Sequence, residues 1–269
     1  MFYPCQVQLG DPASVKQGIV VLTPAESRRL LAKAVASLPE IQGAYEKGRL
    51  AILSGGTTSF VLQEVTGEKL EPPRFSMGMS ADGLLTMSVE EGRVNGRCFV
   101  EGKMVDVPYP DFVRTMGKGD AIVKGANAVD ATGTIGILLS NENGGAIGSV
   151  FGPASARGIP IISPVGLEKQ IASVAEAAEG WGQATLDYSM GVRVGYCAVT
   201  SALVVTEIQA LAILAGVRAR VVGCGGIAGN EGAVILLLEG TGENLERAVR
   251  LVESIKGEPK IEVPCHQLS

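Results

Sequence analysis

A short apolar run that leads into a glycine turn and then into a helix-like segment is the feature that most constrains this fold. Residues 50–53 are apolar throughout, and a turn rich in glycine and hydroxyl groups follows at residues 54–59. Apolar residues then recur at helical spacing as far as Val65. The order predicts a buried strand, a tight turn and a helix, as in sheets that are covered by helices.

The same turn is a candidate site for an anion. Glycine lets the backbone approach a ligand closely, and the N–H groups of a first helical turn have no partner within the helix. These groups favour a negative charge such as a phosphate or a carboxylate. A turn that is glycine-rich for steric reasons alone is the alternative interpretation. The candidate ligand-binding residues here are Ser54, Gly55, Gly56, Thr57, Thr58 and Ser59.

The composition indicates a globular protein and excludes several classes of function. Of the 269 residues, 46% are hydrophobic and 36 are glycine, which is typical of a packed core with many tight turns. The net charge of −5 argues against a general nucleic-acid binder, and no apolar run is long enough to span a bilayer. We therefore expect a cytoplasmic protein that binds neither nucleic acid nor membranes.

The cysteine and histidine residues show no pattern of metal ligands. Five cysteines are dispersed without a CxxC pair, and the single histidine, His266, lies close to the end of the sequence. Reduced and buried thiols are the better interpretation of such cysteines. We expect no bound metal and no cofactor, and we give a Ser-His-Asp triad little weight.

Strands and helices alternate through the first two thirds of the chain. A capping-box pattern at residues 23–26 predicts the start of a helix. Further helices are expected after Pro39 and over residues 148–157 and 167–178. Buried strands are expected at residues 50–53, 121–124, 135–139 and 160–163. This alternation predicts an α/β domain over residues 1–187, with a parallel sheet between two helical layers.

Two segments depart from this alternation. Residues 71–111 contain short alternating pieces and an Asn95-Gly96 turn signal, which predict a β-hairpin excursion. Residues 188–269 follow the order β-α-β-β-α-β, with strands expected at 197–205, 219–223, 233–239 and 259–263. This order is typical of a ferredoxin-like α+β domain. Because small modules of this kind often pair across subunits, we expect a homo-oligomer.

A second polar turn follows the strand predicted at residues 121–124. Its candidate ligand-binding residues are Lys124, Gly125, Asn127 and Asp130. Ligands of open α/β sheets bind outside the carboxyl ends of the strands, so this turn and residues 54–59 are expected to line one crevice. Lys124 would supply the positive charge there. The alternative is structural, with Asn127 as a left-handed turn residue and Lys124 as a solvated strand end.

A third polar segment follows the strand predicted at residues 135–139. Glu142 is the candidate catalytic residue, because a carboxylate at a strand end can act as a base or as a nucleophile. Asn143 and Gly144 beside it are candidate ligand-binding residues. An exposed acidic turn is the alternative interpretation. Arg157 and Lys169 are further candidates for contact with an anion, or are simply solvated.

Together these segments resemble the superfamily of ribose-5-phosphate isomerase, glucosamine-6-phosphate deaminase and the family I CoA transferases. The resemblance covers residues 25–170. The S-G-G-T-T-S turn is similar to the phosphate turn of that superfamily. Residues 120–136 are similar to the isomerases' D-x-x-x-x-G-A-D-E-x-D segment and to the T-G-T segment of lactate-utilisation proteins. Residues 141–144 resemble the S-E-N-G motif around the CoA transferases' nucleophilic glutamate.

The resemblance implies that the protein binds a phosphorylated metabolite or an acyl-CoA-like anion. Lys124 and Asn127 stand where the isomerases have catalytic aspartates, and only Asp130 matches a later acidic position. Isomerase chemistry is therefore not expected. The deaminases also use a histidine, and His266 is the only one available. An acyl-CoA transferase or a related hydrolase that uses Glu142 is the alternative function.

Overall fold

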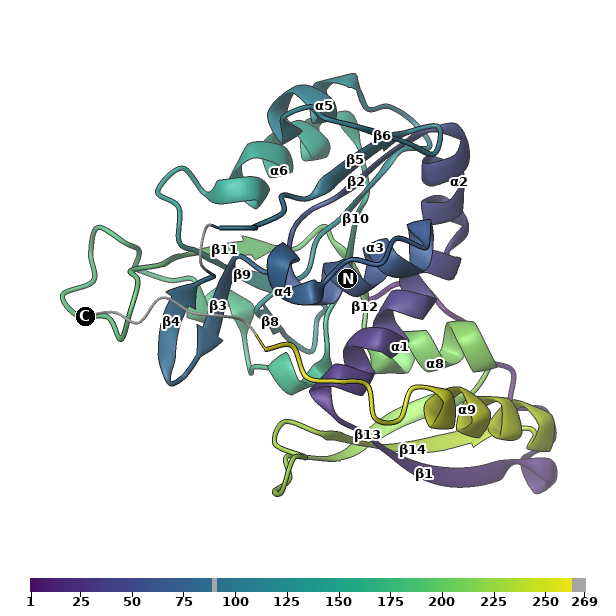
Figure 1. Ribbon diagram of the computed structural model, residues 1–269. Helices are drawn as coiled ribbons and strands as arrows, with labels where there is room; N and C mark the ends of the chain where they lie inside the picture. The colour runs from purple at the N-terminus through teal and green to yellow at the C-terminus, as the bar shows by residue number, and fades with distance from the viewer. Residues whose placement is uncertain (89–90, 263–269) are drawn as a thin grey trace.

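The computed structural model describes residues 1–88 and 91–262, which form a mixed α/β structure built on one six-stranded sheet (Figure 1). The strand order in this sheet is β12-β10-β7-β2-β5-β6. Strands β12, β10, β7 and β2 are parallel to one another. Strand β5 is antiparallel to β2, and β6 is antiparallel to β5. The strands are β2 (Arg49–Ile52), β5 (Arg97–Val100), β6 (Lys103–Val105), β7 (Ala121–Val123), β10 (Ile161–Pro164) and β12 (Leu203–Val205).

The two faces of this sheet carry separate hydrophobic layers. Leu50, Ile52 and Val123 pack on one face, with helices α1 (Pro24–Ser37), α2 (Pro39–Lys47) and α3 (Gly56–Thr66). Ala51 and Ile122 pack on the other face, with α5 (Tyr109–Thr115), α6 (Gly145–Arg157) and a small antiparallel sheet. The sheet is therefore covered on both faces, as the sequence predicts.

Local sequence signals place several of these elements correctly. The capping box at the start of α1 is confirmed, because Thr23 Oγ1 accepts a hydrogen bond from Glu26 N and Glu26 Oε2 accepts one from Thr23 N at 2.9 Å. The glycine turn and the helix after β2 are confirmed as α3. None of the helices in residues 1–88 and 91–262 is long and apolar enough to cross a membrane.

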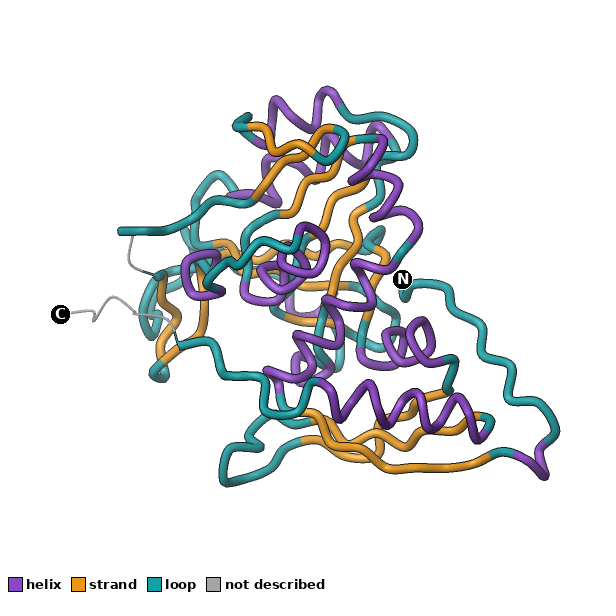
Figure 2. The backbone as a smooth tube through the Cα atoms, turned by 45° about the vertical axis from the view of Figure 1, so that its right-hand side comes forward, coloured by secondary structure: helices purple, strands orange, loops and turns teal. Residues whose placement is uncertain are grey.

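A second antiparallel sheet has the order β1-β14-β13 and takes strands from both ends of the chain. These strands are β1 (Lys16–Leu22), β13 (Arg218–Cys224) and β14 (Val234–Gly240). Figure 2 shows the N-terminal segment running as a loop along the side of the molecule to reach β1. Helices α8 (Glu207–Ala215) and α9 (Gly242–Ser254) cover one face. On the other face Ile19 is 67% exposed and Val222 is 53% exposed.

The strands predicted for a ferredoxin-like unit at residues 188–269 are wrong in part. Residues 197–205 are divided between β11 (Gly195–Val199) and β12, which belong to different sheets. Residues 259–262 form no strand, and Val263 lies outside the described part of the chain. Strand β1 pairs with β14 instead, through seven consecutive residue pairs. A strand far away in sequence therefore lies beside β14, and the β-α-β-β-α-β pattern of residues 188–269 did not include it.

The strand predicted at residues 135–139 also lies in a different sheet from the one expected. It is β9 (Ile135–Leu139), in an antiparallel sheet of order β11-β9-β8, with β8 (Ala128–Val129). Asp130 accepts hydrogen bonds from the backbone of Thr132 and Thr134, which closes a tight turn between β8 and β9. Parallel neighbours need a crossover of a dozen or more residues, and this turn is far too short for one.

Two further local predictions are corrected. The hairpins of the β excursion turn at Asp82-Gly83 and Glu101-Gly102, where φ is positive, and not at Asn95-Gly96. Gly96 is needed for close packing, because a Cβ there would overlap the Tyr109 hydroxyl and the Ile52 carbonyl. The helix predicted at 167–178 is interrupted, since Ile171 N donates to Val129 O at 2.9 Å. The remaining elements are η1 (Pro12–Ser14), β3 (Gly78–Ala81), β4 (Leu84–Met87), α4 (Pro72–Phe75), η2 (Leu167–Lys169) and α7 (Val174–Ala177).

Candidate functional site

The turn at residues 54–59 and the turn after β7 lie side by side at the carboxyl edge of the large sheet. Strands β2 and β7 are parallel neighbours, and Leu53 N donates to Val123 O at 2.9 Å. A Cβ built on Gly125 would lie 3.9 Å from Thr58 Cγ2, which is van der Waals contact. The edge of the sheet thus brings the first two predicted segments together.

The hydroxyl groups of the first turn are mostly used by the protein itself. Thr58 Oγ1 donates to Leu53 O and Ser59 Oγ donates to Gly56 O, both at 2.6 Å. Ser54 Oγ lies 3.3 Å from Met77 Sδ, and Thr57 is buried. Gly55, the N-cap of α3, has no side chain to cap the helix. What this turn offers an anion is therefore its backbone N–H groups.

Lys124 brings a positive charge to the same edge. Its backbone is fixed by bonds from Lys124 N to Ile162 O at 3.1 Å and from Ser163 Oγ to Lys124 O at 2.6 Å. Its side chain is half-buried, and within residues 1–88 and 91–262 its ammonium group has neither a hydrogen bond nor an ion pair. Burial and, second, the charge of Lys169 lower the pKa of Lys124 to about 8.

The adjacent Glu168 and charged groups from α1 and α8 lie near Lys169, which follows β10. Burial lowers the pKa of Lys169, Glu168 and Glu207 raise it, and Arg28 on α1 lowers it. The Lys169 Nζ lies 3.9 Å from Glu168 Oε1. Glu168 Oε2 is buried without a hydrogen bond to any described residue and lies over Gly166, where a Cβ would overlap it. The edge cluster, as we name it, consists of Arg28, Lys124, Glu168, Lys169 and Glu207.

Glu207 starts α8 directly beyond the end of β12 and is fully buried. Its Oε2 accepts a hydrogen bond from Leu167 N at 3.0 Å. Burial and the neighbouring charge of Glu168 raise the pKa of Glu207 to about 7, although the bond from Leu167 opposes the shift. Sequence reasoning missed Glu168, Glu207 and Arg28. The position of the two glutamates, just after buried strands, was the signal that could have found the carboxylates.

We expect Glu207→Gln to remove a pH dependence of the stability between about pH 4.5 and pH 7. The ordinary pKa is 4.5 and the folded value is about 7, so in this window the folded state holds a proton that the unfolded state has lost. The stability of the wild type therefore falls as the pH rises, by on the order of 1–3 kcal/mol. Glutamine still accepts the Leu167 N–H and cannot titrate. Urea unfolding of both proteins at these two pH values tests this, and equal losses would contradict it.

Asp130 and Asn127 hold the β8–β9 hairpin together. Asp130 Oδ1 accepts hydrogen bonds from the N–H and hydroxyl of Thr132 and from Thr134 N, and Oδ2 accepts one from Val174 N at 3.0 Å. Burial would raise the pKa of Asp130, but these bonds outweigh it and lower the pKa. Asn127 is exposed, and its Oδ1 accepts from Leu138 N at 3.0 Å. Both side chains therefore have structural partners.

The third predicted segment lies in the turn between β9 and α6. Glu142 and Asn143 are exposed, and Gly144 is the left-handed N-cap of α6 with φ 80°. No hydrogen bond or ion pair joins Glu142 to any residue in the described ranges. Arg157 Nε donates to Met116 O at 3.1 Å, at the other end of α6. These residues thus have no direct polar link to the edge cluster.

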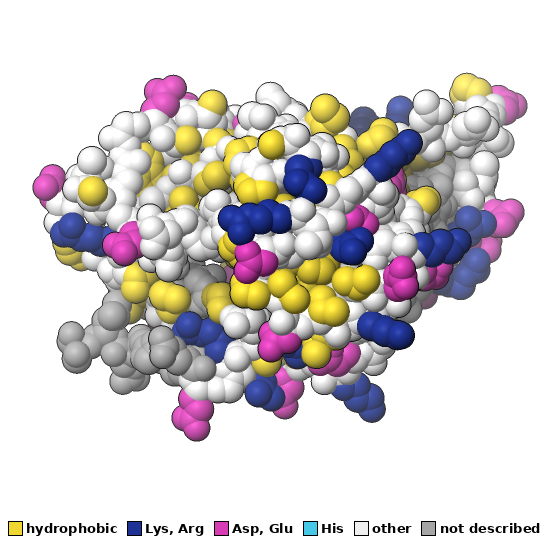
Figure 3. Space-filling view, turned by 90° about the horizontal axis from the view of Figure 1, so that it is seen from above, with side chains coloured by type: hydrophobic (Ala, Val, Ile, Leu, Met, Phe, Trp, Pro, Cys, Tyr) yellow, Lys and Arg dark blue, Asp and Glu magenta, His cyan; other side chains and the backbone are white. Residues whose placement is uncertain are grey.

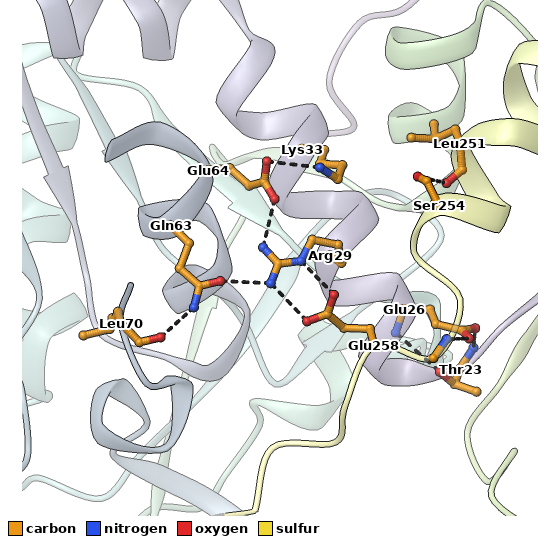
Figure 4. Close-up of polar contacts among 11 residues, drawn as sticks. Thr23, Glu26, Arg29, Lys33, Gln63, Glu64, Leu70, Leu251, Ser254 and Glu258 are labelled. Carbon is orange, nitrogen blue, oxygen red and sulfur yellow. Dashed lines mark hydrogen bonds and ion pairs between the residues drawn. The ribbon is translucent and has the colours of Figure 1, made fainter. Parts of the chain in front are cut away.

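The C-terminal segment, residues 256–262, runs along α1 and reaches the glycine turn. Lys256 Nζ pairs with Glu26 Oε2 at 2.9 Å, and Glu258 pairs with Arg29 (Figure 4). Ile261 Cδ1 lies 3.3 Å from where a Cβ on Gly56 would be. The segment therefore reaches the turn at residues 54–59 through Ile261, which lies over Gly56.

Two hollows lie on the surface near these elements. One, of about 560 Å³, is lined by Arg29, Glu64 and the end of α3. The other, of about 420 Å³, lies between the end of β12 and β13, and Asp130 and Thr206 are part of its wall. Neither hollow includes Lys124 or residues 54–59.

No protein-family model matches the chain, and no curated protein matches it. Within residues 1–88 and 91–262 no group of three or more His, Cys, Asp or Glu side chains could hold a metal ion, and His266 lies outside these ranges. On the face that Figure 3 shows, basic and acidic side chains are interspersed.

Proposed function

We propose that the protein binds a phosphorylated metabolite or an acyl-CoA-like anion at the carboxyl edge of β2 and β7. The observation that carries this proposal is Lys124, a half-buried residue whose ammonium group has no partner in the described part of the chain. A buried charge without a partner is costly, and a bound anion would offset that cost. Lys169 and the N–H groups at the start of α3 would contribute to the same site.

The order of the three segments supports a distant relationship to the isomerase, deaminase and CoA transferase superfamily. Isomerase chemistry is not part of the proposal, because Lys124 and Asn127 replace the carboxylates that it needs. An acyl-CoA transferase reaction at Glu142 gains no support, since this side chain is exposed and has no polar partner in the described ranges. The proposal is therefore one of binding.

Binding at the first turn of α3 requires a movement of residues 256–262. Ile261 lies against Gly56, so an anion on the N–H groups there would take the place of the isoleucine side chain. We expect Ile261→Gly to bind an anion more tightly than the wild type does, because the ligand no longer has to displace an apolar side chain.

Calorimetric titration with ribose 5-phosphate and, separately, with acetyl-CoA tests the proposal and distinguishes its two ligand classes. We expect saturable binding of one of them, weakened about tenfold to hundredfold in Lys169→Met, as for the loss of one charged hydrogen bond. Glu142→Gln and the exposed control Lys118→Met should bind like the wild type. Absence of heat with both ligands in Ile261→Gly, or a loss confined to Glu142→Gln, would contradict it.

A further inference from the structure

We propose that Lys124 is a nucleophile that forms an imine with an aldehyde or ketone bearing a phosphate or carboxylate group. This inference rests on the proposed function, because the same edge would hold the negative charge of the substrate. It goes further in assigning a covalent step to Lys124, which anion binding alone would use only as a cation.

The placement of Lys124 is that of a reactive amine and differs from that of a structural lysine. It directly follows β7. Its backbone N–H donates to Ile162 O and its carbonyl oxygen accepts from Ser163 Oγ, both on β10. Its side chain is half-buried and its ammonium group has no carboxylate partner in residues 1–88 and 91–262. A lysine in a structural ion pair would have such a partner. The backbone of Lys124 is therefore fixed by β10, whereas its ammonium group has no polar partner in the described residues.

A second cation beside this amine favours the reactive form. Only a neutral amine attacks a carbonyl, and desolvation or a neighbouring positive charge favours the neutral amine. Lys124 has both, since burial and, second, the charge of Lys169 lower its pKa to about 8. About a tenth of Lys124 is then neutral at pH 7, whereas an ordinary exposed lysine is almost wholly protonated.

The reaction uses only groups of the edge cluster and releases water. The Lys124 Nζ lone pair attacks the carbonyl carbon, and one proton moves from nitrogen to the carbonyl oxygen, which gives a carbinolamine. The hydroxyl group then leaves with a proton as water, and the C=N bond forms.

The substrate class follows from the charges of the cluster. Three cations, Arg28, Lys124 and Lys169, stand against Glu168 and Glu207, and the raised pKa of Glu207 leaves it partly uncharged at neutral pH. When Lys124 is neutral, Lys169 and the first turn of α3 still attract an anion. An open-chain sugar phosphate or a 2-oxo acid combines the required carbonyl with the required charge.

Borohydride trapping tests the proposal on the full chain. Glyceraldehyde 3-phosphate or glyoxylate is added at pH 7 with sodium borohydride, which reduces an imine to a stable secondary amine, and peptides are mapped by mass spectrometry. We expect the peptide that contains Lys124 to gain the mass of the probe less one oxygen atom. Labelling of Lys124 should exceed that of the exposed Lys103 at least about tenfold.

Controls separate this proposal from the proposed function. Lys103→Arg should leave the label on Lys124 unchanged, Lys124→Arg should lose it, and the uncharged acetaldehyde should label Lys124 less than glyoxylate does. Heat of binding for a probe without preferential label on Lys124 would overturn the imine and leave anion binding intact. Neither heat nor label would overturn both proposals, and a label on Lys169 in place of Lys124 would overturn the assignment of the nucleophile.

Discussion

Lys124→Met is expected to make the protein more stable and to weaken its affinity for anions. At pH 7 the ammonium group of Lys124 is charged, half-buried and without a partner in the described residues. Methionine has a similar length and no charge to desolvate, so the folded state loses a cost that the unfolded state never had. We expect a gain of on the order of 1–3 kcal/mol in the free energy of unfolding.

The pH dependence of this gain has a definite sign. The pKa of Lys124 is about 8 in the folded state against an ordinary value of 10.5, so between these values the unfolded state binds more protons. The stability of the wild type relative to the variant therefore rises with pH across this window, and the gain from Lys124→Met shrinks toward zero. A group that was paired in the folded state would show the opposite trend.

Urea unfolding near pH 7 and near pH 10 measures the expected gain in stability, and calorimetric titration measures the expected loss of anion affinity. Lys118→Met is the matched control, because Lys118 is exposed, and it should change the stability by less than about 0.5 kcal/mol. Affinity for the anion should fall about tenfold to hundredfold in Lys124→Met and stay unchanged in Lys118→Met. A variant that is less stable than the wild type and still binds would refute the role given to Lys124.

Arg29→Ala is expected to destabilise the protein by about 2–4 kcal/mol. In the centre of Figure 4, Arg29 joins α1 to α3 and to the C-terminal segment. Its guanidinium group bonds to Glu258 at 2.9 Å, to Glu64 at 2.8 Å and to Gln63 at 2.9 Å. The arginine side chain is 17% exposed, and so is that of Glu258. Alanine would leave a largely buried carboxylate without its counterion.

Thermal or urea unfolding measures this loss, and two variants calibrate it. Arg250→Ala removes an exposed ion pair with Glu246 on the surface of α9 and should cost less than about 0.5 kcal/mol. Arg29→Lys keeps the charge but not the planar fork of donors, so an intermediate loss is expected. If Arg29→Ala costs no more than Arg250→Ala, the contacts of Arg29 do not hold the C-terminal segment in place.

Elements that depend on neighbouring residues could be predicted from the sequence. The capping box of α1, the turn before α3 and the buried strands β2, β7 and β10 all follow from short patterns. The partner of a strand does not follow from such patterns, because apolar alternation is the same in every sheet. This is why the pairing of β1 with β14 and the position of β9 in a separate sheet were not foreseen.

For the candidate site too, only the features that depend on neighbouring residues could be predicted. The strand-end rule brought Lys124 next to residues 54–59, since both turns follow parallel neighbours. Glu207 was not predicted as a site residue, because acidic residues are common in the first turn of a helix. The structural use of Asp130 could not be read from spacing, because one of its partners, Val174, is 44 residues away.

The most direct test is the protection of individual lysines from acetylation by acetic anhydride, measured by mass spectrometry with and without ribose 5-phosphate. At saturating ligand we expect the labelling of Lys124 and Lys169 to slow roughly tenfold, while the exposed Lys103 and Lys118 react at unchanged rates. If the ligand binds but leaves the rate at Lys124 and Lys169 unchanged, the anion binds elsewhere, and the edge of the large sheet is not its site.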